Sequence, residues 1–335
     1  MPTFSLIIPV HNGLAHLPRC LAAVQRSRFQ DWELIVVDDG STDGSGRVAE
    51  TMGARVVGTR GRNGPAFARN LGASQATGQY LFFTDADCEL HEDTLGNAAA
   101  ILQTHPHLDA LIGSYDDSPA HPGFISQYKN LLHHFTHQTS REEAQTFWTG
   151  CGAIRRDKFM ALGGFDAHRY PRPAIEDIEL GYRLRAVGGT IHLAKQVQVK
   201  HWKQWTFLSL LHSDIFDRAI PWTALLREQK SLPSDLNLQW RDRISAAAVI
   251  FLILQISYSF LRLSRPTRPH PFPLFPLPLI LLLLNRHFYQ FLWRKRGPLF
   301  GVRAIPLHWF YYFYSSLAFG WATLRACKRL SSVKT

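Results

Sequence analysis

Two aspartates stand one residue apart where a strongly apolar stretch ends. Residues 80–83 (YLFF) have the composition of a buried strand and lead directly to Asp85 and Asp87. A packed core disfavours charge, so packing does not explain the pair. Two carboxylates one residue apart offer hard oxygen ligands to a divalent cation such as Mg²⁺ or Mn²⁺, which neutralises a diphosphate in nucleotide sites. The spacing therefore predicts a cation site at the end of a strand.

Polar groups also follow two other predicted strands. Residues 4–10 (FSLIIPV) lead to His11 and Asn12, and residues 32–37 (WELIVV) lead to Asp38 and Asp39. Segments 14–27, 43–52 and 65–75 have helical spacing or helix-start signals, and this alternation predicts a mostly parallel sheet with helices on both faces. Ligands of such sheets bind at the carboxyl ends of the strands, so the three polar groups are expected along one edge. Asp38 and Asp39 could instead cap the next helix, and either aspartate pair alone could be a solvated turn.

Four motifs in order carry a family resemblance: PVHN (9–12), VVDDGSTDGS (36–45), GPAFARNLG (64–72) and FTDADC (83–88). Together they resemble a family 2 glycosyltransferase with the GT-A fold, over roughly residues 3–205. The resemblance implies a nucleotide-sugar donor, with a UDP-sugar favoured. It implies that Pro9, Asn12 and Asp39 shape the nucleotide pocket, Asp39 recognising the base. Asp85 and Asp87 would hold ribose and the metal-bound diphosphate, and Arg69 would face phosphate unless it is an ordinary helix-surface arginine.

Two later segments resemble the acceptor side of the same family. In residues 147–166 (FWTGCGAIRRDKFMALGGFD), Trp148, Gly150 and Gly152 would line the acceptor site, where a glycine-rich turn lets substrate approach the backbone; the glycines could equally permit a strand bulge. Residues 174–189 (AIEDIELGYRLRAVGG) resemble the E-D motif, which assigns the general base to Asp177 and an acceptor-side place to Glu176. Acids at a helix start are also favoured by the helix dipole, so a structural role is the alternative.

The resemblance weakens at residues 201–205. Processive members carry Q-x-x-R-W, whereas this chain has HWKQW, so only Trp205 matches and Lys203 would supply the cation. This departure favours a single transfer over polymer synthesis. The family reaction inverts the anomeric centre, because the acceptor hydroxyl attacks opposite the leaving diphosphate while a carboxylate takes its proton.

The last third of the chain is both basic and apolar. The net charge is +11, and residues 241–335 hold 14 Lys and Arg against one acid, Asp242. Residues 244–261 and 304–324 contain no charge and have the length of a bilayer crossing, while residues 272–284 are short and broken by prolines, as in a re-entrant or tilted element. A membrane with anionic lipid is therefore the expected partner, and nucleic acid is not. A buried pair of core helices is the alternative, and flanking basic clusters leave the topology open.

These features predict three regions: a GT-A catalytic domain at 1–205, an interfacial amphipathic segment at 206–240 and a membrane anchor at 241–335. Phe207, Leu208, Leu211, Ile215 and Phe216 share a helical face that could meet a bilayer or pack on the catalytic domain. No secretory signal is recognised at the start, so the catalytic domain is expected on the cytoplasmic side. The scattered cysteines predict buried free thiols, and His133, His134 and His137 are interpreted as surface or acceptor-groove residues.

The sequence thus predicts a membrane-anchored, inverting glycosyltransferase that uses Mn²⁺ or Mg²⁺ and a lipid-linked acceptor hydroxyl. Two alternatives stay open. One is a polyprenyl-phosphate sugar synthase, in which the acceptor is already ionised and Asp177 is less necessary. The other is a non-catalytic membrane scaffold that binds a nucleotide sugar.

Overall fold

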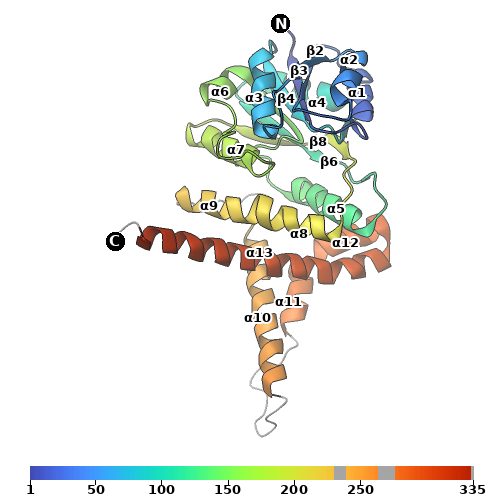
Figure 1. Ribbon diagram of the computed structural model, residues 1–335. Coiled ribbons are helices and arrows are strands. Elements are labelled where there is room, and N and C mark those ends of the chain that lie inside the picture. Colours follow the sequence, from blue (N-terminus) through green and yellow to red (C-terminus); the bar gives the residue numbers. More distant parts are fainter. Residues whose placement is uncertain (230–238, 263–275, 333–335) are drawn as a thin grey trace. The chain divides into compact units, whose positions relative to one another are not determined.

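The computed structural model describes residues 1–229, 239–262 and 276–332, with side chains up to residue 260 in the second range and 325 in the third. The chain divides into two compact units, Met1–Thr206 and Phe207–Thr335 (Figure 1).

The first unit is built on an eight-stranded sheet with the order β3-β2-β1-β4-β7-β6-β8-β5. The first four strands are mutually parallel, as the sequence predicts, and β6 is parallel to β8. Strand β7 runs antiparallel to both β4 and β6, and β5 antiparallel to β8. The bounds are β1 Phe4–Val10, β2 Trp32–Asp38, β3 Arg55–Gly58, β4 Tyr80–Thr84, β5 Cys88–Leu90, β6 Ala110–Tyr115, β7 Cys151–Arg155 and β8 Ile191–His201.

Neighbouring residues of a strand point to opposite faces of the sheet, and helices cover both faces. Phe82 packs on Phe4 in the core that α1, α2 and α4 complete. Phe83 points the other way, towards Phe159 and Phe165 at 5.5 and 5.3 Å between ring centroids. The helices are α1 Leu17–Gln25, α2 Ser45–Thr51, α3 Pro65–Gln75, α4 Thr94–Thr104, α5 Phe124–Thr139, α6 Arg156–Ala161 and α7 Glu176–Ala186.

The parallel strands bring their carboxyl ends to one edge. Pro9 lies opposite Val37 and Val10 opposite Asp38 in the β1–β2 register. The amide of Asp39 donates to the carbonyl of Val10 at 2.8 Å. The residues that follow β1, β2 and β4 are therefore neighbours, which confirms the expected polar edge.

The second unit is helical, with α13 (Pro298–Ser332) packed against most of the other helices. Helix α8 (Phe207–His212) continues through a π-helical turn, η1 (Ser213–Ala219), into α9 (Ile220–Glu228), and this run lies along α13. Helices α10 (Trp240–Arg262) and α11 (Pro276–Leu284) project from α13 as a pair (Figure 1). Helix α12 (Arg286–Arg296) packs on α13.

Of the two predicted bilayer crossings, one is matched. Within the described residues one helix, Trp240–Phe260, is long and apolar enough to cross a membrane, which is weak support on its own. The stretch 304–324 is too polar to count as such a helix, so the expected second crossing there gains no support. It lies inside α13, where Trp, Tyr and His lower its hydropathy and Tyr312 and His308 are buried in the unit. Of the segment 272–284, residues 276–284 form α11 and the remainder lies outside the described residues.

Candidate functional site

Asp85 and Asp87 lie just beyond β4, and Cys88 begins β5. One ligand atom from each of these three residues falls within 4.8 Å of the others. Burial, with the charges of Asp87 and Asp85, raises the pKa of the Cys88 thiol well above its usual value. The sulfur therefore stays protonated and suits a hard cation poorly. The two carboxylates fit Mg²⁺ or Mn²⁺, and the thiol does not.

His201, at the end of β8, reaches the same place. Cys88 lies opposite His201 in the β5–β8 register, and His201 Nε2 is 3.6 Å from Asp87 Oδ2. The imidazole is buried and stacks on Tyr115, with 4.2 Å between centroids and 10° between planes. In the sequence, residue 201 is noted only as a mismatch to the Q-x-x-R-W motif. Its contact with Asp87 depends on the pairing of β8 with β5, which no local sequence pattern encodes.

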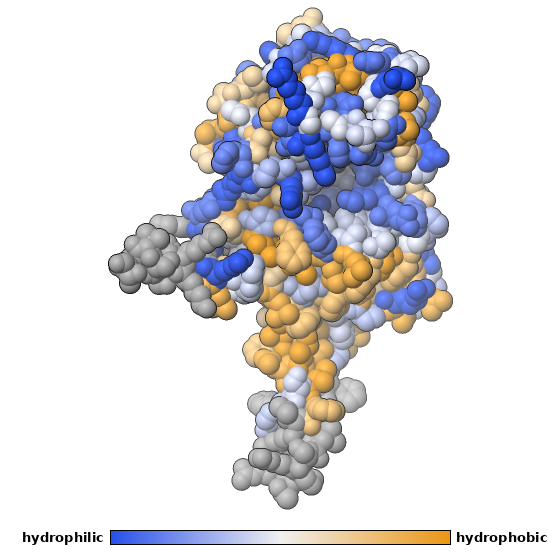
Figure 2. Space-filling view, viewed as in Figure 1, coloured by the Kyte–Doolittle hydropathy of each residue, from blue (hydrophilic) through white to orange (hydrophobic). Residues whose placement is uncertain are grey.

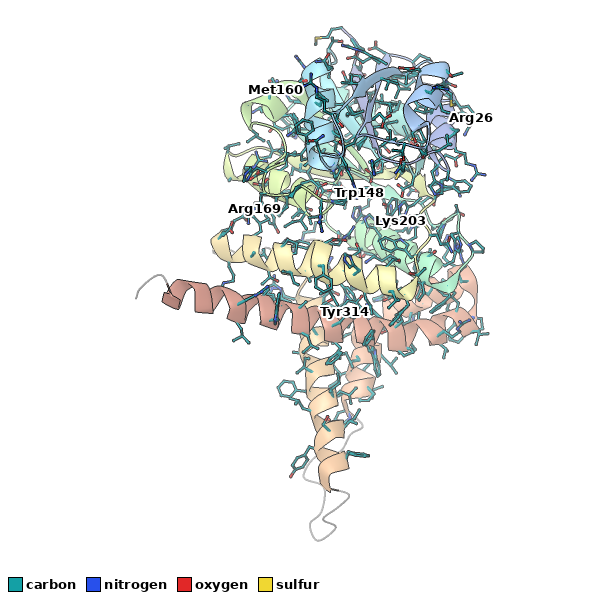
Figure 3. All side chains as sticks on the ribbon, viewed as in Figure 1. Arg26, Trp148, Met160, Arg169, Lys203 and Tyr314 are labelled. Atoms are coloured by element: carbon teal, nitrogen blue, oxygen red, sulfur yellow. The ribbon has the colours of Figure 1, made fainter. Side chains whose placement is uncertain are left out.

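Positive charge gathers around Asp87. Burial acts to raise the pKa of Asp87, but the charge and hydrogen bond of His201 and the charge of Lys203 outweigh it, so the pKa is lowered. Lys203 is exposed, and its Nζ lies 4.2 Å from the centroid of the Trp205 ring. The ring of Trp205 is buried, and its amide donates to Ser126 Oγ at 2.8 Å. Lys203 (labelled in Figure 3) is thus a cation beside the carboxylate pair.

Arg69, on α3, is buried rather than on a helix surface. Its Nη2 donates to Asp85 Oδ1 at 2.7 Å and its Nη1 to Glu176 Oε1 at 2.9 Å. The surface alternative is therefore wrong, and a phosphate contact stays a prediction because both Nη groups bind protein carboxylates. Burial and the charge of Asp177 raise the pKa of Glu176, although Arg69 opposes them. Arg69 links the carboxylate pair to the first residue of α7.

Asp177 is the second residue of α7, where the helix dipole favours a negative charge. Its Oδ1 accepts from the amide of Ile178 at 2.8 Å. Its Oδ2 accepts from the amide and the hydroxyl of Thr149 at 3.2 and 3.3 Å. These contacts fix the carboxylate next to the segment that resembles the acceptor side.

Gly150 and Gly152 are packed closely against the protein itself. A Cβ at Gly150 would lie 2.4 Å from the Trp148 indole, and one at Gly152 would lie 2.3 Å from the Trp148 carbonyl oxygen. Internal packing thus accounts for both glycines, and the approach of substrate to the backbone there stays a prediction. The half-buried Trp148 ring lies 4.8 Å from the Tyr115 ring and 4.7 Å from the His133 ring.

Two of the three histidines on α5 are buried, so their interpretation as surface residues is wrong. His134 Nδ1 lies 2.7 Å from the carbonyl of Tyr115, and His137 Nδ1 lies 2.9 Å from the carbonyl of Gly113. These contacts tie α5 to β6. His133 is half-buried, with its ring 4.5 Å from the Tyr115 ring.

The predicted nucleotide-side residues hold loops together. Asn12 has a φ of 51°, and its Oδ1 accepts from the amide of Thr42 at 2.8 Å. The buried Asp39 carboxylate accepts from the amides of Asn63 and Gly64 at 2.9 and 2.7 Å. Pro9 is half-buried within β1. Asp39 thus orders residues 59–64, and recognition of a base by Asp39 stays a prediction.

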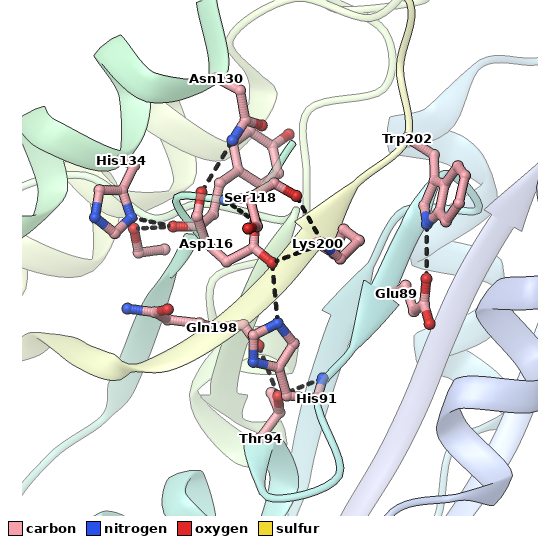
Figure 4. A network of polar contacts seen from close by, with 12 residues as sticks. Glu89, His91, Thr94, Asp116, Ser118, Asn130, His134, Gln198, Lys200 and Trp202 are labelled. Carbon is pink, nitrogen blue, oxygen red and sulfur yellow. Dashed lines mark hydrogen bonds and ion pairs between the residues drawn. The ribbon is translucent and has the colours of Figure 1, made fainter. Parts of the chain in front are cut away.

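A polar network steadies the strand that carries His201 (Figure 4). Asp116 directly follows β6. Its Oδ2 lies 3.1 Å from His91 Nε2 and 3.5 Å from Lys200 Nζ. Its carbonyl accepts from Asn130 Nδ2 at 3.0 Å. Beside this network, Trp202 Nε1 donates to Glu89 Oε2 at 2.8 Å. The residues on both sides of His201 are therefore held by buried or half-buried partners.

The free cysteines Cys20, Cys88 and Cys151 are all buried, which confirms the expectation for those three. The side chain of Cys327 lies outside the described residues.

Some curated proteins match a part of this chain, and others match most of it. A PGL/p-HBAD biosynthesis glycosyltransferase of Mycobacterium bovis is 39% identical over 118 residues, which are 33% of this chain and 46% of that protein. This chain therefore spans less than half the length of that relative. Glycosyltransferase AglE of Haloferax volcanii is 25% identical over 279 residues, which are 81% of this chain and 84% of that protein.

Solved structures share the fold. The mannosyltransferase PcManGT of Pyrobaculum calidifontis, in complex with GDP-Man and Mn²⁺, has a TM-score of 0.53 at 18% identity, covering 97% of this chain and 86% of that chain. TarS 1-349 of S. aureus, in complex with UDP-GlcNAc, has a TM-score of 0.53 at 20% identity, covering 86% and 81%. These likenesses confirm the expected GT-A fold.

Residues 5–163 match the family model described as Glycosyl transferase family 2. This range contains Asp39, Arg69, Asp85 and Asp87 and ends before Glu176, Asp177 and His201. Just under half of the chain is therefore similar to a glycosyl transferase family 2 domain.

Proposed function

We propose that the chain transfers a sugar from a nucleotide-sugar donor to an acceptor hydroxyl. The observation that carries this proposal is the link through Arg69, which joins the Asp85–Asp87 pair to the start of α7, where Asp177 stands. Such a reaction needs one acidic group for a cation and another as a base, and this edge supplies both. The nucleotide sugars bound by PcManGT and TarS support the donor class. A UDP-sugar is the donor to test first.

Asp85, Asp87 and His201 would hold the divalent cation. Two carboxylates suit Mn²⁺ and Mg²⁺ alike, and an imidazole beside them favours Mn²⁺. Bound there, the cation offsets the negative charge that grows on the departing nucleoside diphosphate. Lys203 adds a positive charge beside the same oxygens.

Asp177 would take the proton of the acceptor hydroxyl as its oxygen attacks the anomeric carbon. The new carbon–oxygen bond forms as the bond to the diphosphate breaks on the opposite side, which inverts the anomeric centre. Thr149 keeps Oδ2 of Asp177 directed, and Arg69 pairs with the neighbouring Glu176. Trp148, next to Thr149 in the chain, is the residue we propose to contact the acceptor.

The acceptor we propose is lipid-linked, because the second unit contains a helix with the length and hydropathy of a membrane crossing. The catalytic unit would work on the cytoplasmic side, and the mismatch to Q-x-x-R-W at residues 201–205 favours a single transfer. If the acceptor were a polyprenyl phosphate, its oxygen would need no base. If the chain were a scaffold, it would bind donor without turnover.

The test is nucleoside diphosphate release from UDP-, GDP- and dTDP-sugars by the detergent-purified chain, with Mn²⁺ or Mg²⁺ and a membrane lipid extract. The proposal predicts cation- and extract-dependent release from one donor, lost in both Asp87→Asn and Asp177→Asn. Activity that survives Asp177→Asn but not Asp87→Asn identifies the polyprenyl-phosphate reaction. Donor binding without release in any extract favours the scaffold.

A further inference from the structure

Helices α10 and α11 expose apolar side chains over much of their length (Figure 2). They are Ile244, Phe251, Leu254, Ile256, Tyr258 and Phe260 on α10 and Leu279, Ile280, Leu282 and Leu283 on α11. At about 100° per residue, Phe251 and Ile256 point about 140° apart, so the apolar surface is wider than a single stripe. A helix that docks in a protein groove needs one apolar stripe, whereas a helix in lipid is apolar on all its free sides. This surface fits a lipid bilayer.

The two helices run antiparallel, and polar groups gather at one end of the pair. Asn285, which follows α11, donates from Nδ2 to Ser245 Oγ near the start of α10 at 3.1 Å. Tyr312 of α13 donates to Asp242 Oδ1 and to Asn285 Oδ1, both at 3.0 Å. We call Asp242, Ser245, Asn285 and Tyr312 the base network. It ties the start of α10 and the end of α11 to α13.

Charged residues also stand at the C-terminal end of α10. Helix α10 ends at Arg262, and the sequence that follows contains Arg265 and Arg268. Arg262 lies nineteen positions after Arg243, which is about 28 Å of helix and close to the hydrocarbon thickness of a bilayer. Arg243 is the last charged residue before that gap, and residues 244–261 contain none. The apolar length is therefore bounded by charge at both ends, as in a full crossing.

A hairpin that only dipped into the bilayer would leave three arginines in hydrocarbon. Charged side chains there are strongly disfavoured. The return path, residues 272–284, also carries no charge, and its thirteen residues are shorter than a full helical crossing, a mismatch that local thinning of the bilayer accommodates. Crossing to the far side and returning is the arrangement that keeps every one of these arginines at a membrane surface.

We infer that the chain crosses the bilayer twice, outward through α10 and back through residues that include α11. This inference rests on the proposed membrane anchoring and supplies its topology. Residues 263–275 then lie on the far side, whereas the base network, α12 and α13 remain on the near side. Among residues 1–229 the structure describes no helix with the length and hydropathy of a crossing, so the catalytic unit also stays on the near side.

The near side suits a lipid surface with anionic headgroups. Helix α12 buries Phe288, Tyr289 and Leu292 and ends in Arg294, Lys295 and Arg296. Trp293 is exposed on the same helix. Tryptophan and basic residues together are typical of the bilayer interface.

Three single-cysteine variants test the topology in the full chain, made in a Cys327→Ser background because the other native cysteines are buried. Ser264→Cys reports on the far segment, Gln290→Cys on α12 and Thr51→Cys on the catalytic unit, and both Gln290 and Thr51 are exposed. Right-side-out and inside-out vesicles are treated with a membrane-impermeant maleimide, and the modified fraction is read from a gel shift. The background without an added cysteine is the control.

The inference predicts that Ser264→Cys is modified from one face and that Gln290→Cys and Thr51→Cys are modified from the other. It is overturned if all three react from the same face, if Ser264→Cys reacts only after detergent is added, or if Gln290→Cys and Thr51→Cys react from opposite faces. Labelling needs no turnover, so sugar transfer measured in the same vesicles fails or succeeds independently of the topology.

Discussion

Nη1 of Arg69 lies 2.9 Å from Oε1 of Glu176, across 107 residues of sequence. Only 5% and 6% of these two side chains are exposed. The same guanidinium binds Asp85 on its other arm. One buried cation thus holds the carboxylate pair of β4 and the start of α7 in a fixed relation, and its removal would leave two carboxylates uncompensated.

Replacing Arg69 with Met should lower the free energy of unfolding by about 3–5 kcal/mol, because breaking a buried ion pair on one side leaves charge without a partner. Chemical denaturation of the detergent-purified chain measures this. Arg28→Met is the matched control, since Arg28 pairs with Glu92 on the surface and should cost at most about 1 kcal/mol. The double variant Arg69→Met/Glu176→Gln should recover part of the loss. Equal costs for Arg69→Met and Arg28→Met would contradict the role given to this ion pair.

Replacing His201 with Ala should weaken Mn²⁺ affinity by at least about tenfold, as loss of a metal ligand or its close support does. Cys88→Ser should leave affinity nearly unchanged, because a buried, protonated thiol is not a ligand. Electron paramagnetic resonance of free Mn²⁺, titrated with each variant, compares the two. A larger effect of Cys88→Ser than of His201→Ala would show that the wrong third ligand has been assigned.

Replacing Thr149 with Val should lower kcat by about tenfold with little change in KM, since a hydrogen bond to a charged group is worth about 1.5 kcal/mol or more and one to Asp177 is lost. Asp177→Asn should cost about 10²- to 10⁴-fold. Thr146→Val is the control, because the buried Thr146 hydroxyl has no hydrogen-bond partner among the described residues. Steady-state kinetics separates these cases, and a Thr146 effect as large as that of Thr149 would mean that general loop damage is being measured.

The His91–Asp116 pair predicts a pH dependence of stability. The hydrogen bond to Asp116 raises the pKa of His91, although burial opposes it. A raised folded-state pKa gives stability that is fully present below the unfolded value of about 6.5 and is lost as pH rises through the folded value. Tm measured between about pH 5.5 and 8.5 should therefore fall more steeply towards neutral pH in the wild type than in His91→Gln. Parallel Tm profiles would contradict this.

Local patterns were enough for the first half of the catalytic unit. Helix α3 spans residues 65–75 as predicted, and the motifs after β1, β2 and β4 share one edge because their strands are parallel. The contact of His201 with Asp87 could not be predicted, since it depends on β8 pairing with β5 across the sheet. Likewise, the room at Gly150 is filled by Trp148, which depends on the path of one loop.

Local sequence patterns also fail to show which side chains are buried. His134 and His137 read as polar residues on a helix, and their contacts with the carbonyls of Tyr115 and Gly113 in β6 explain why both are inside. In the second unit, hydropathy singled out both α10 and residues 304–324, and among the described residues only α10 has the length and hydropathy of a membrane crossing. Within 304–324, aromatic side chains pack against other helices of the unit, as Phe310 does on Phe207.

The place of β8 in the sheet sets an order of events during synthesis. It is the last strand of the sheet to leave the ribosome, yet it lies between β6 and β5 rather than at an edge. Until it arrives, those two strands present open edges to other chains, a known route to aggregation. A nascent chain that has passed Asp87 has the two carboxylates proposed to bind the cation but lacks His201 for another 114 residues. Binding of the proposed cation by all three residues would therefore be a late step of folding, and it would report that the whole sheet has closed.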